Sequence, residues 1–539
     1  MVLLQNLPTE LLCRILDLLP EYEGDALHTK TRNRDSHGAL LPLRIRKKAL
    51  LNLCLVSHRF RSLAQPVLFR YFQWDDLGAD LYDEEDEFRA LLQFAKAIFQ
   101  RPQLGEYVQF MSIDTLLDET PISFLSFDGA AQKYLTDAIK KLDLSNKAKK
   151  LWTGAPARCD LPIILAMVIK MAPNLRGLRF PDGYHILERI NTVWRSEPSL
   201  LSALQCLWIS ADEEEFYWYQ ISRYEKLLCL PHVNSSTFEY GTLTGSSFPS
   251  TWTPGSLGVE EIAFAHCHID ATAIRKFLSA CRKVRAVTFQ NFSFVDQDVR
   301  PKSKGRAQFN AADLHAAVLP HKETLEHFHL EFFRDPSILG SIEAYENFCR
   351  SHAKIPSFAD FPVLDTIFIQ HALLPEHPIF SPALELLKIT DCNSSIRDMV
   401  GFIAADVKAG QYPRLKKFTI ITVDITRPVK LPGQRIPVNQ TPEQCFLSLE
   451  ALFKGTGVNF MIAPYEMPPD IYGGSDDDYD DLDGIMGDDF GYDLDAPYGY
   501  QFPPTNGMPA GLMMMMQQAM QNPALAEESD RSWETEDEV

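Results

Sequence analysis

The sequence lacks the motifs that mark common enzyme classes. It contains no glycine-rich phosphate loop, no G-x-S-x-G elbow, no H-E-x-x-H motif and no kinase signature. None of its ten cysteines forms a C-x-x-C pair. Several of them lie in apolar surroundings, where a free cysteine behaves as a small hydrophobic residue. We therefore expect no catalytic residue, no metal site and no cofactor, and the thiols are expected to be reduced.

Long hydrophobic runs are also lacking. The most apolar run, Leu161 to Val168, is far too short to span a bilayer. No basic segment precedes the N-terminal leucines, so the start does not resemble a signal peptide. These absences predict a protein of the cytoplasm, the nucleus or both, without a membrane partner.

Basic residues are almost absent from the last part of the chain. Between Pro464 and Val539 there are 19 acidic residues and one basic residue, Arg531, for a net charge of −18. The whole chain carries −20, so residues 1–463 carry only −2. A nearly neutral body without a basic stripe argues against direct nucleic-acid binding. Residues 464–539 should form a disordered acidic tail, which either solubilises the protein or binds a basic partner.

Apolar residues are abundant in the N-terminal segment, in the pattern of a helix. Pro8 suits a first helical turn, and Glu10 places a negative charge where the helix dipole favours one. The residues that follow make the helix apolar over more than half of its circumference: Leu11, Leu12, Ile15, Leu16, Leu18 and Leu19. Such a helix needs partners on two sides, which suggests that one of them is another chain.

With a second apolar stretch, this segment resembles an F-box. Leu7-Pro8 matches the start of the family pattern, Ile15-Leu16 its first helix, and Leu53 with Val56-Ser57 its second helix. The resemblance implies a three-helix F-box at residues 1–72 that docks on the Skp-type adaptor of cullin-based ubiquitin ligases. The implied adaptor-binding residues are Leu7, Pro8, Leu11, Leu12, Ile15, Leu16, Leu53 and Val56. The alternative is a core-forming helical hairpin that only begins with Leu-Pro.

One departure from the F-box pattern is an insert of about residues 21–44 between the first two helices. It carries Lys30, Arg32 and Arg34 and little apolar content, so we expect a solvated loop there. After the F-box, Arg61 to Phe72 should continue as a helix broken by Pro66. Residues 73–160 should form a helical connector, with helices at Phe88–Phe99 and Ala130–Leu142.

A repeated motif occupies residues 161–463. Its clearest copy runs from Val259 to Ile269 and matches L-x-x-L-x-L-x-x-C-x-L at every fixed position. Other copies begin at Leu175, Leu204, Val284, Leu325, Leu364, Leu384 and Leu415, and a weaker one has Phe238 and Tyr240. A helix is expected near Pro442–Lys454 and a last strand at Phe460–Ile462.

These copies resemble leucine-rich repeats of irregular length. In that family each repeat contributes one strand, whose first, fourth and sixth residues point inward, and neighbouring repeats stack into one core. The resemblance implies an α/β fold in which the F-box is followed by an irregular repeat solenoid. An ordinary α/β domain with parallel strands remains the alternative.

The outward residues of these strands are the expected substrate face. Trp208 and Phe368 would be interface anchors if exposed, but a shift of one residue in register would make them core. His327, His329 and Glu331 alternate and could hold a metal, although a solvated face is the favoured interpretation. His266-Cys267-His268 has the wrong spacing for a chelating pair. The outward set is Arg179, Trp208, Glu261, Thr288, Gln290, His327, His329, Phe368, Lys388 and Lys417.

Both resemblances together imply a non-catalytic adaptor. Its F-box would recruit the Skp-type adaptor and through it a cullin, and its repeats would hold a protein substrate for ubiquitination by this SCF-type ligase. The alternative is a ligase-independent scaffold that carries the Skp-type adaptor into another assembly.

Overall fold

The computed structural model describes thirteen stretches of the chain. They are residues 7–17, 48–73, 84–113, 129–141, 146–154, 161–182, 186–196, 199–211, 219–290, 309–332, 353–392, 396–422 and 449–464. The chain divides into two compact units, Met1–Pro469 and Asp470–Val539, and all described residues belong to the first. The insert predicted at residues 21–44 lies outside the described residues. So does the tail predicted at residues 464–539, except Pro464, which is the last residue of a strand.

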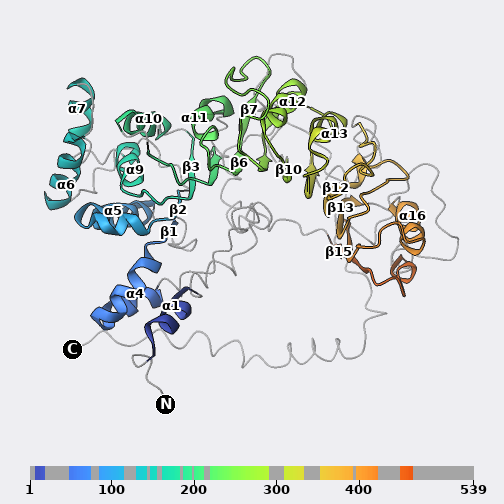
Figure 1. The fold of residues 1–539 in the computed structure, drawn as a ribbon, viewed down its shortest axis with the longest axis horizontal. Coiled ribbons are helices and arrows are strands. Elements are labelled where there is room, and N and C mark those ends of the chain that lie inside the picture. Colours follow the sequence, from blue (N-terminus) through green and yellow to red (C-terminus); the bar gives the residue numbers. More distant parts are fainter. Residues whose placement is uncertain are drawn as a thin grey trace, which may run out of the picture. The chain divides into compact units, whose positions relative to one another are not determined.

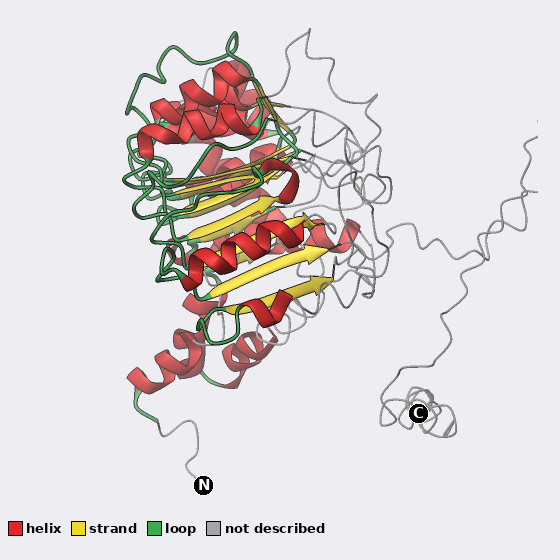
Figure 2. Cartoon of the chain, turned by 90° about the vertical axis from the view of Figure 1, so that its right-hand side faces the viewer, coloured by secondary structure: helices red, strands yellow, loops and turns green. Residues whose placement is uncertain are grey.

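One long parallel sheet dominates the first unit. Its twelve strands follow the order of the chain, and every neighbouring pair is parallel. Figure 2 shows the strands stacked and running in one direction. The strands are β1 Tyr71–Gln73, β2 Phe110–Ser112, β3 Gly177–Pro181, β4 Cys206–Ser210, β6 Ser235–Glu239, β8 Glu261–Ala265, β10 Ala286–Gln290, β11 His327–Glu331, β12 Thr366–Gln370, β13 Leu386–Cys392, β14 Lys417–Thr422 and β15 Asn459–Pro464.

Three short strands form a second parallel sheet beside the long one: β5 Tyr219–Gln220, β7 Gly241–Leu243 and β9 His268–Ile269.

The helices that connect the long sheet's strands lie along one side of the strand row (Figure 1). The helices are α1 Thr9–Asp17, residues 48–56, α4 His58–Leu68, α5 Glu84–Gln100, η3 Pro102–Tyr107, α6 Gly129–Lys140, α7 Asn146–Thr153, α9 Leu161–Lys170, α10 Ile186–Ser196, η4 Ile221–Tyr224, α11 Glu225–Leu228, α12 Ala271–Ala280, α13 Ala311–Val318, η6 Leu319–His321, η7 His371–Leu373, α16 Ile396–Lys408 and residues 449–452.

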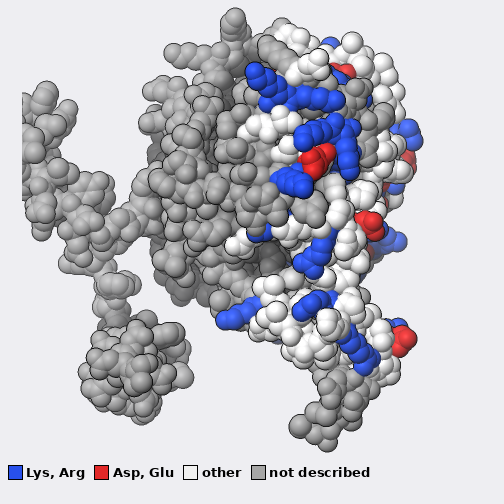
Figure 3. All heavy atoms as spheres, turned by 90° about the vertical axis from the view of Figure 1, so that its left-hand side faces the viewer, with Lys and Arg blue, Asp and Glu red and all other residues white. Residues whose placement is uncertain are grey.

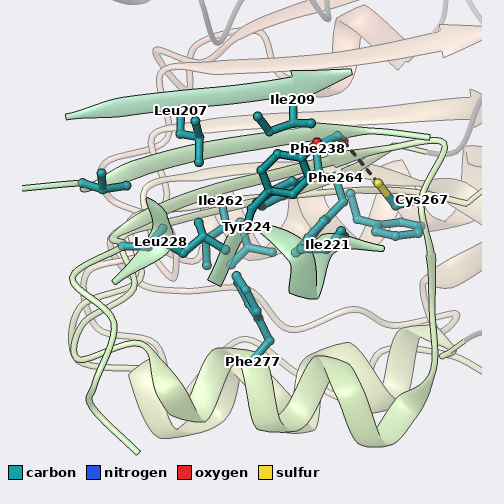
Figure 4. Packing of buried hydrophobic residues seen from close by; sticks show 14 of the residues in the cluster. Leu207, Ile209, Ile221, Tyr224, Leu228, Phe238, Ile262, Phe264, Cys267 and Phe277 are labelled. Carbon is teal, nitrogen blue, oxygen red and sulfur yellow. Dashed lines mark hydrogen bonds between the residues drawn. The ribbon is translucent and has the colours of Figure 1, made fainter. Parts of the chain in front are cut away.

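The α/β class and the long parallel sheet are confirmed, and the sheet is consistent with stacked repeats. Each predicted copy of the motif places a strand that begins at its position 3, counted from its first apolar residue, and runs at least to position 7. Positions 1, 4 and 6 point into the core, as Val259, Ile262 and Phe264 do in β8. Figure 4 shows such residues from neighbouring strands packed together, with Phe277 from α12 beneath them.

Position 2 of each repeat joins neighbouring strands at their N-terminal ends. The carbonyl oxygen of Asn234 accepts hydrogen bonds from the backbone N–H groups of Glu260 and Glu261, at 2.7 and 2.9 Å. The same double acceptance begins at Arg70 and recurs along the sheet as far as Glu385. The strand before it thus holds each strand from β2 to β14 in register.

The motif's ninth position contains a buried cysteine in two repeats. Cys267 Sγ donates to the carbonyl oxygen of Phe238 in the preceding repeat, at 3.2 Å (Figure 4). Cys392 Sγ lies 3.3 Å from the carbonyl oxygen of Ile389. The sulfhydryl group therefore supplies the donor that closes the turn after the strand.

The sheet begins earlier in the chain than the predicted repeat boundary at residue 161. β1 and β2 lie within the predicted F-box and connector, yet both are strands of the long sheet. Val108, Met111 and Ile113 occupy positions 1, 4 and 6 of an early repeat and are buried. The predicted helix through Phe72 is wrong at its end, because α4 contains Pro66, ends at Leu68 and is followed by β1.

The weak copy with Phe238 and Tyr240 is a real strand, β6, in a different register. Its core positions are Val233, Ser236 and Phe238. Tyr240 follows the strand with a φ of +60°, a left-handed conformation that His266 and Asp391 share at the same repeat position. The predicted helices of the connector are present as α5 and α6, and the predicted last strand is present as β15.

No helix in the described part of the chain is both long and apolar enough to cross a membrane.

Candidate functional site

The N-terminal helices have their own small core, separate from that of the sheet. Leu16, Leu50, Ala64 and Val67 form this core, and Leu53 packs half-buried against it. Leu12 is also buried. Leu12 and Leu16, two of the predicted adaptor-binding residues, therefore stabilise the helical cluster itself.

Two helices of this cluster each carry exposed apolar side chains. Leu11 and Ile15 lie one helical turn apart on α1, and both are exposed. Leu51 and Leu55 have the same spacing on helix 48–56, next to Val56; Leu55 is 78% exposed and Val56 67%. We call these five residues the helical apolar face. Large apolar side chains gathered in this way are typical of protein-binding surfaces.

Polar contacts fix the ends of these helices. The Ser57 side chain accepts a hydrogen bond from the backbone N–H of Phe60, which caps the N-terminus of α4. Arg59 donates to the carbonyl oxygen of Leu7 at 2.7 Å, across 52 residues of sequence. The exposed Pro8 follows directly, so the Leu7-Pro8 segment is held against α4.

The long sheet places the predicted substrate face in the predicted register. Trp208 lies between the core residues Leu207 and Ile209 on β4 and points to the opposite face. However, both aromatics are buried in this register, since Trp208 is only 3% exposed and Phe368 8%. Gln290 and His329 are likewise buried, whereas Arg179, Glu261, His327, Thr288, Lys388 and Lys417 are half-exposed or exposed.

Arg179 organises one end of this face. Its guanidinium lies 3.9 Å from the centre of the Trp208 ring and 3.7 Å from the Glu239 carboxylate. These contacts cover the indole with a cation. The indole N–H of Trp208 has no hydrogen-bond partner among the described residues. Glu239 was not predicted, although its position 7 is one of the outward positions of the motif.

A polar group lies farther along the same face. His329 Nε2 is 3.3 Å from the Glu331 carboxylate and 3.2 Å from the amide nitrogen of Gln290. The His329 ring also meets Phe368 edge to face at 5.3 Å. His327, two residues earlier, points instead toward Asp365 at 3.4 Å. The three residues considered for a metal therefore do not converge: His329 contacts Glu331, whereas His327 contacts Asp365.

No group of three or more His, Cys, Asp or Glu side chains in the described stretches is arranged to hold a metal ion. His266 stacks on Tyr240, with ring centres 4.8 Å apart, while Cys267 turns into the core. Burial raises the pKa of the Cys267 thiol. A buried thiol with a raised pKa is a weak nucleophile, because the thiolate is the reactive form.

Basic side chains gather on α6 and α7. Residues 129–141 and 146–154 contain six lysines and one acidic residue, Asp137, which pairs with Lys140 at 3.1 Å. Lys133, Lys141 and Lys150 are exposed. Figure 3 shows Lys and Arg outnumbering Asp and Glu on one side of the described part of the molecule. Residues 1–463 are nearly neutral as a whole, but they contain a local basic region.

Sequence reasoning named Leu11, Ile15 and Val56 of the helical apolar face but missed Leu51 and Leu55. Their four-residue spacing before Val56-Ser57 was the available signal.

In comparisons with known proteins, the sequence matches no family model and no curated protein.

Proposed function

We propose that this chain is a non-catalytic substrate adaptor of an SCF-type ubiquitin ligase, with an F-box at its N-terminus and a leucine-rich-repeat-like body. The observation that carries the proposal is the helical apolar face. α1 and helix 48–56 share a core, yet each also turns a stripe of leucine, isoleucine or valine outward. Those stripes need a partner helix, and the Skp-type adaptor is the partner that the F-box resemblance implies.

The size of the helical apolar face suits a stable complex. Burying a fully exposed side chain of this size contributes about 1.5–3 kcal/mol. Leu55 and Val56, the most exposed of the five, have the most to gain from a partner, whereas Leu11, Ile15 and Leu51 are already about half-buried.

The sheet's outer face has the character of a protein-recognition surface. Positively charged, negatively charged and histidine side chains alternate along it, from Arg179 and Glu261 to His327 and Lys388. Bound there, a substrate would be held at high effective concentration near the ligase without any chemistry by this chain.

A pull-down with the Skp-type adaptor tests the first half of the proposal. The double substitution Ile15→Asp with Leu55→Asp places charges on both stripes and should abolish co-purification. Both side chains are exposed, so the helical cluster should remain folded. Ile379→Asp, at an exposed apolar residue of the sheet region, is the matched control and should bind normally. Unchanged adaptor binding by the double variant would refute the F-box assignment.

Ubiquitin-remnant profiling tests the second half. Cells with and without the protein should differ in the ubiquitination of a small set of proteins, and the Ile15→Asp, Leu55→Asp variant should behave like the deletion. If the Skp-type adaptor binds this chain but the ubiquitination profile does not change, the alternative of a ligase-independent scaffold would be favoured.

A further inference from the structure

The last strand of the long sheet, β15, has one open side. It pairs in parallel with β14, from Lys417 opposite Asn459 to Thr422 opposite Pro464. No strand in the described stretches pairs with its other side. β15 is thus an edge at the end of a continuous parallel sheet.

The open side presents backbone hydrogen-bonding groups. The N–H of Asn459 donates to the carbonyl oxygen of Lys416 at 2.8 Å, on the β14 side. In a parallel ladder, alternate residues direct both of their backbone groups to the same neighbour. Phe460 and Ile462 therefore direct their N–H and C=O groups to the open side. Such a row of groups is a template for another strand.

The hydrophobic core is also incompletely closed at this end. Phe460 and Ile462 occupy positions 4 and 6, the core positions of the motif, but both are only half-buried. Their counterparts on β14, Phe418 and Ile420, are fully buried. Phe460 stacks on Phe453 at 4.8 Å and meets Phe418 edge to face at 5.1 Å, yet its side chain remains only half-buried. Stacked repeats need a cap at their ends, and an added strand would supply one.

β15 carries none of the charges that usually protect an edge strand from pairing. Its sequence from Asn459 to Pro464 contains no charged residue, and Met461 at its middle is 40% exposed. Pro464, which has no N–H, limits the length of any added ladder without blocking it.

We propose that β15 is a dimerisation strand, to which the β15 strand of a second copy of this chain adds in antiparallel orientation. With the two-fold axis at Met461, Phe460 of each copy lies opposite Ile462 of the other copy. These are the residues whose backbone groups face the open side, so they form reciprocal hydrogen bonds. Their side chains also meet on the core side as an aromatic and β-branched pair, a favourable combination.

The strand's own complementarity identifies a second copy as the occupant. In this register the backbone N–H and C=O groups of Phe460 and Ile462 find hydrogen-bond partners. The incompletely closed hydrophobic cores of the two copies also meet, and no like charges lie opposite each other. An interface of this kind is isologous, as most homodimer interfaces are. The long sheet would then continue from one copy into the next.

Analytical ultracentrifugation of the full chain tests the proposal. The protein should show a concentration-dependent monomer–dimer equilibrium. Met461→Lys places two positive charges opposite each other at the axis and should weaken dimerisation at least tenfold without changing the circular dichroism spectrum. Ile379→Lys, at another exposed apolar residue, is the control and should leave the equilibrium unchanged. A wild-type protein that stays monomeric, or a dimer that tolerates Met461→Lys, would overturn the proposal.

Cross-linking tests the register independently. A Met461→Cys variant should form a disulfide-linked dimer on mild oxidation, because directly opposed residues at a non-hydrogen-bonded antiparallel position lie about 4.5 Å apart at Cα. Asn459→Cys is the positional control. It would lie opposite Ala463 of the second copy, so it should not cross-link to itself. Equal cross-linking of the two variants, at the level of the unmodified protein, would exclude the axis at Met461.

Discussion

The guanidinium of Arg59 donates a hydrogen bond of 2.7 Å to the carbonyl oxygen of Leu7. This bond joins the segment before α1 to the first turn of α4, so it orients the start of α1 beside the rest of the helical cluster. It therefore links a polar side chain, which no apolar pattern identifies, to the surface that we propose for the Skp-type adaptor.

Arg59→Ala should weaken adaptor binding by about three- to tenfold, with little change in melting temperature. One exposed hydrogen bond to a charged donor stabilises its geometry by about 0.5–1.5 kcal/mol. Isothermal titration calorimetry with the purified adaptor measures the effect. Arg275→Ala is the control, since that guanidinium bonds to Ala271 of its own helix. Equal affinity of the Arg59 and Arg275 variants would show that the bond does not orient the binding surface.

The folded protein should lose stability as the pH falls below about 6.5, in part through His371. Burial, assisted by the positive charge of Lys354, lowers the pKa of His371 to about 3. The unfolded chain binds this proton near pH 6.5, whereas the folded chain does not. The contribution of His371 is therefore complete above pH 6.5 and declines by about 1.4 kcal/mol per pH unit on acidification toward pH 3.

Urea unfolding between pH 7 and 4.5 measures this slope. His371→Gln removes the titrating group and should flatten the dependence of stability on pH, whatever its effect on stability at pH 7. Identical slopes for wild type and His371→Gln would contradict the assignment.

Cys267 and Cys229 should differ sharply in reactivity. Burial raises the pKa of both thiols, but Cys267 is fully buried whereas Cys229 is exposed to reagents. Brief treatment of the native protein with iodoacetamide should therefore modify Cys229 first, and Cys267 only after unfolding. Peptide mass spectrometry quantifies both sites. Rapid modification of Cys267 in the native protein would mean that the turn after β8 opens readily.

Two buried serines should respond to alanine in opposite directions. Ser236 occupies a core position of β6, and its hydroxyl has no hydrogen-bond partner among the described residues. Ser381 is equally buried, but its hydroxyl donates to the carbonyl oxygen of Phe361 at 2.7 Å. Ser236→Ala should raise the free energy of unfolding by about 1 kcal/mol, and Ser381→Ala should lower it by about 1–2 kcal/mol. Chemical denaturation measures both, and a loss of stability in Ser236→Ala would contradict the prediction.

The sequence pattern was sufficient for β8, a five-residue strand whose three core positions are all apolar. Val259, Ile262 and Phe264 identified β8 in the correct register, because a strand buried on one face must repeat its apolar residues at fixed spacing. At β6, Ser236 interrupted this spacing, and Tyr240 beyond the strand was included in error. In β1 and β2 the strands are only three residues long, too short for the pattern to be distinguished from the helices around them.

The exposure of the outward residues could not be predicted in this way. Spacing decides the face of the sheet on which Trp208 lies, but not how much of its ring neighbours cover. The ring is covered in part by Arg179, which lies 29 residues earlier in the sequence. Likewise, the pattern could identify Ile15 as apolar but could not decide between the helical core and its surface.

The strand-to-strand arrangement from Arg70 to Asn459 also has a mechanical consequence. In the described stretches, each strand of the long sheet pairs only with its neighbours in the strand order, and no strand pairing joins one end of the sheet to the other. A pulling force applied between β1 and β15 would therefore detach repeats one after another from the weaker end. The force record should show a series of small steps, each releasing one repeat's length of chain, in place of a single large rupture.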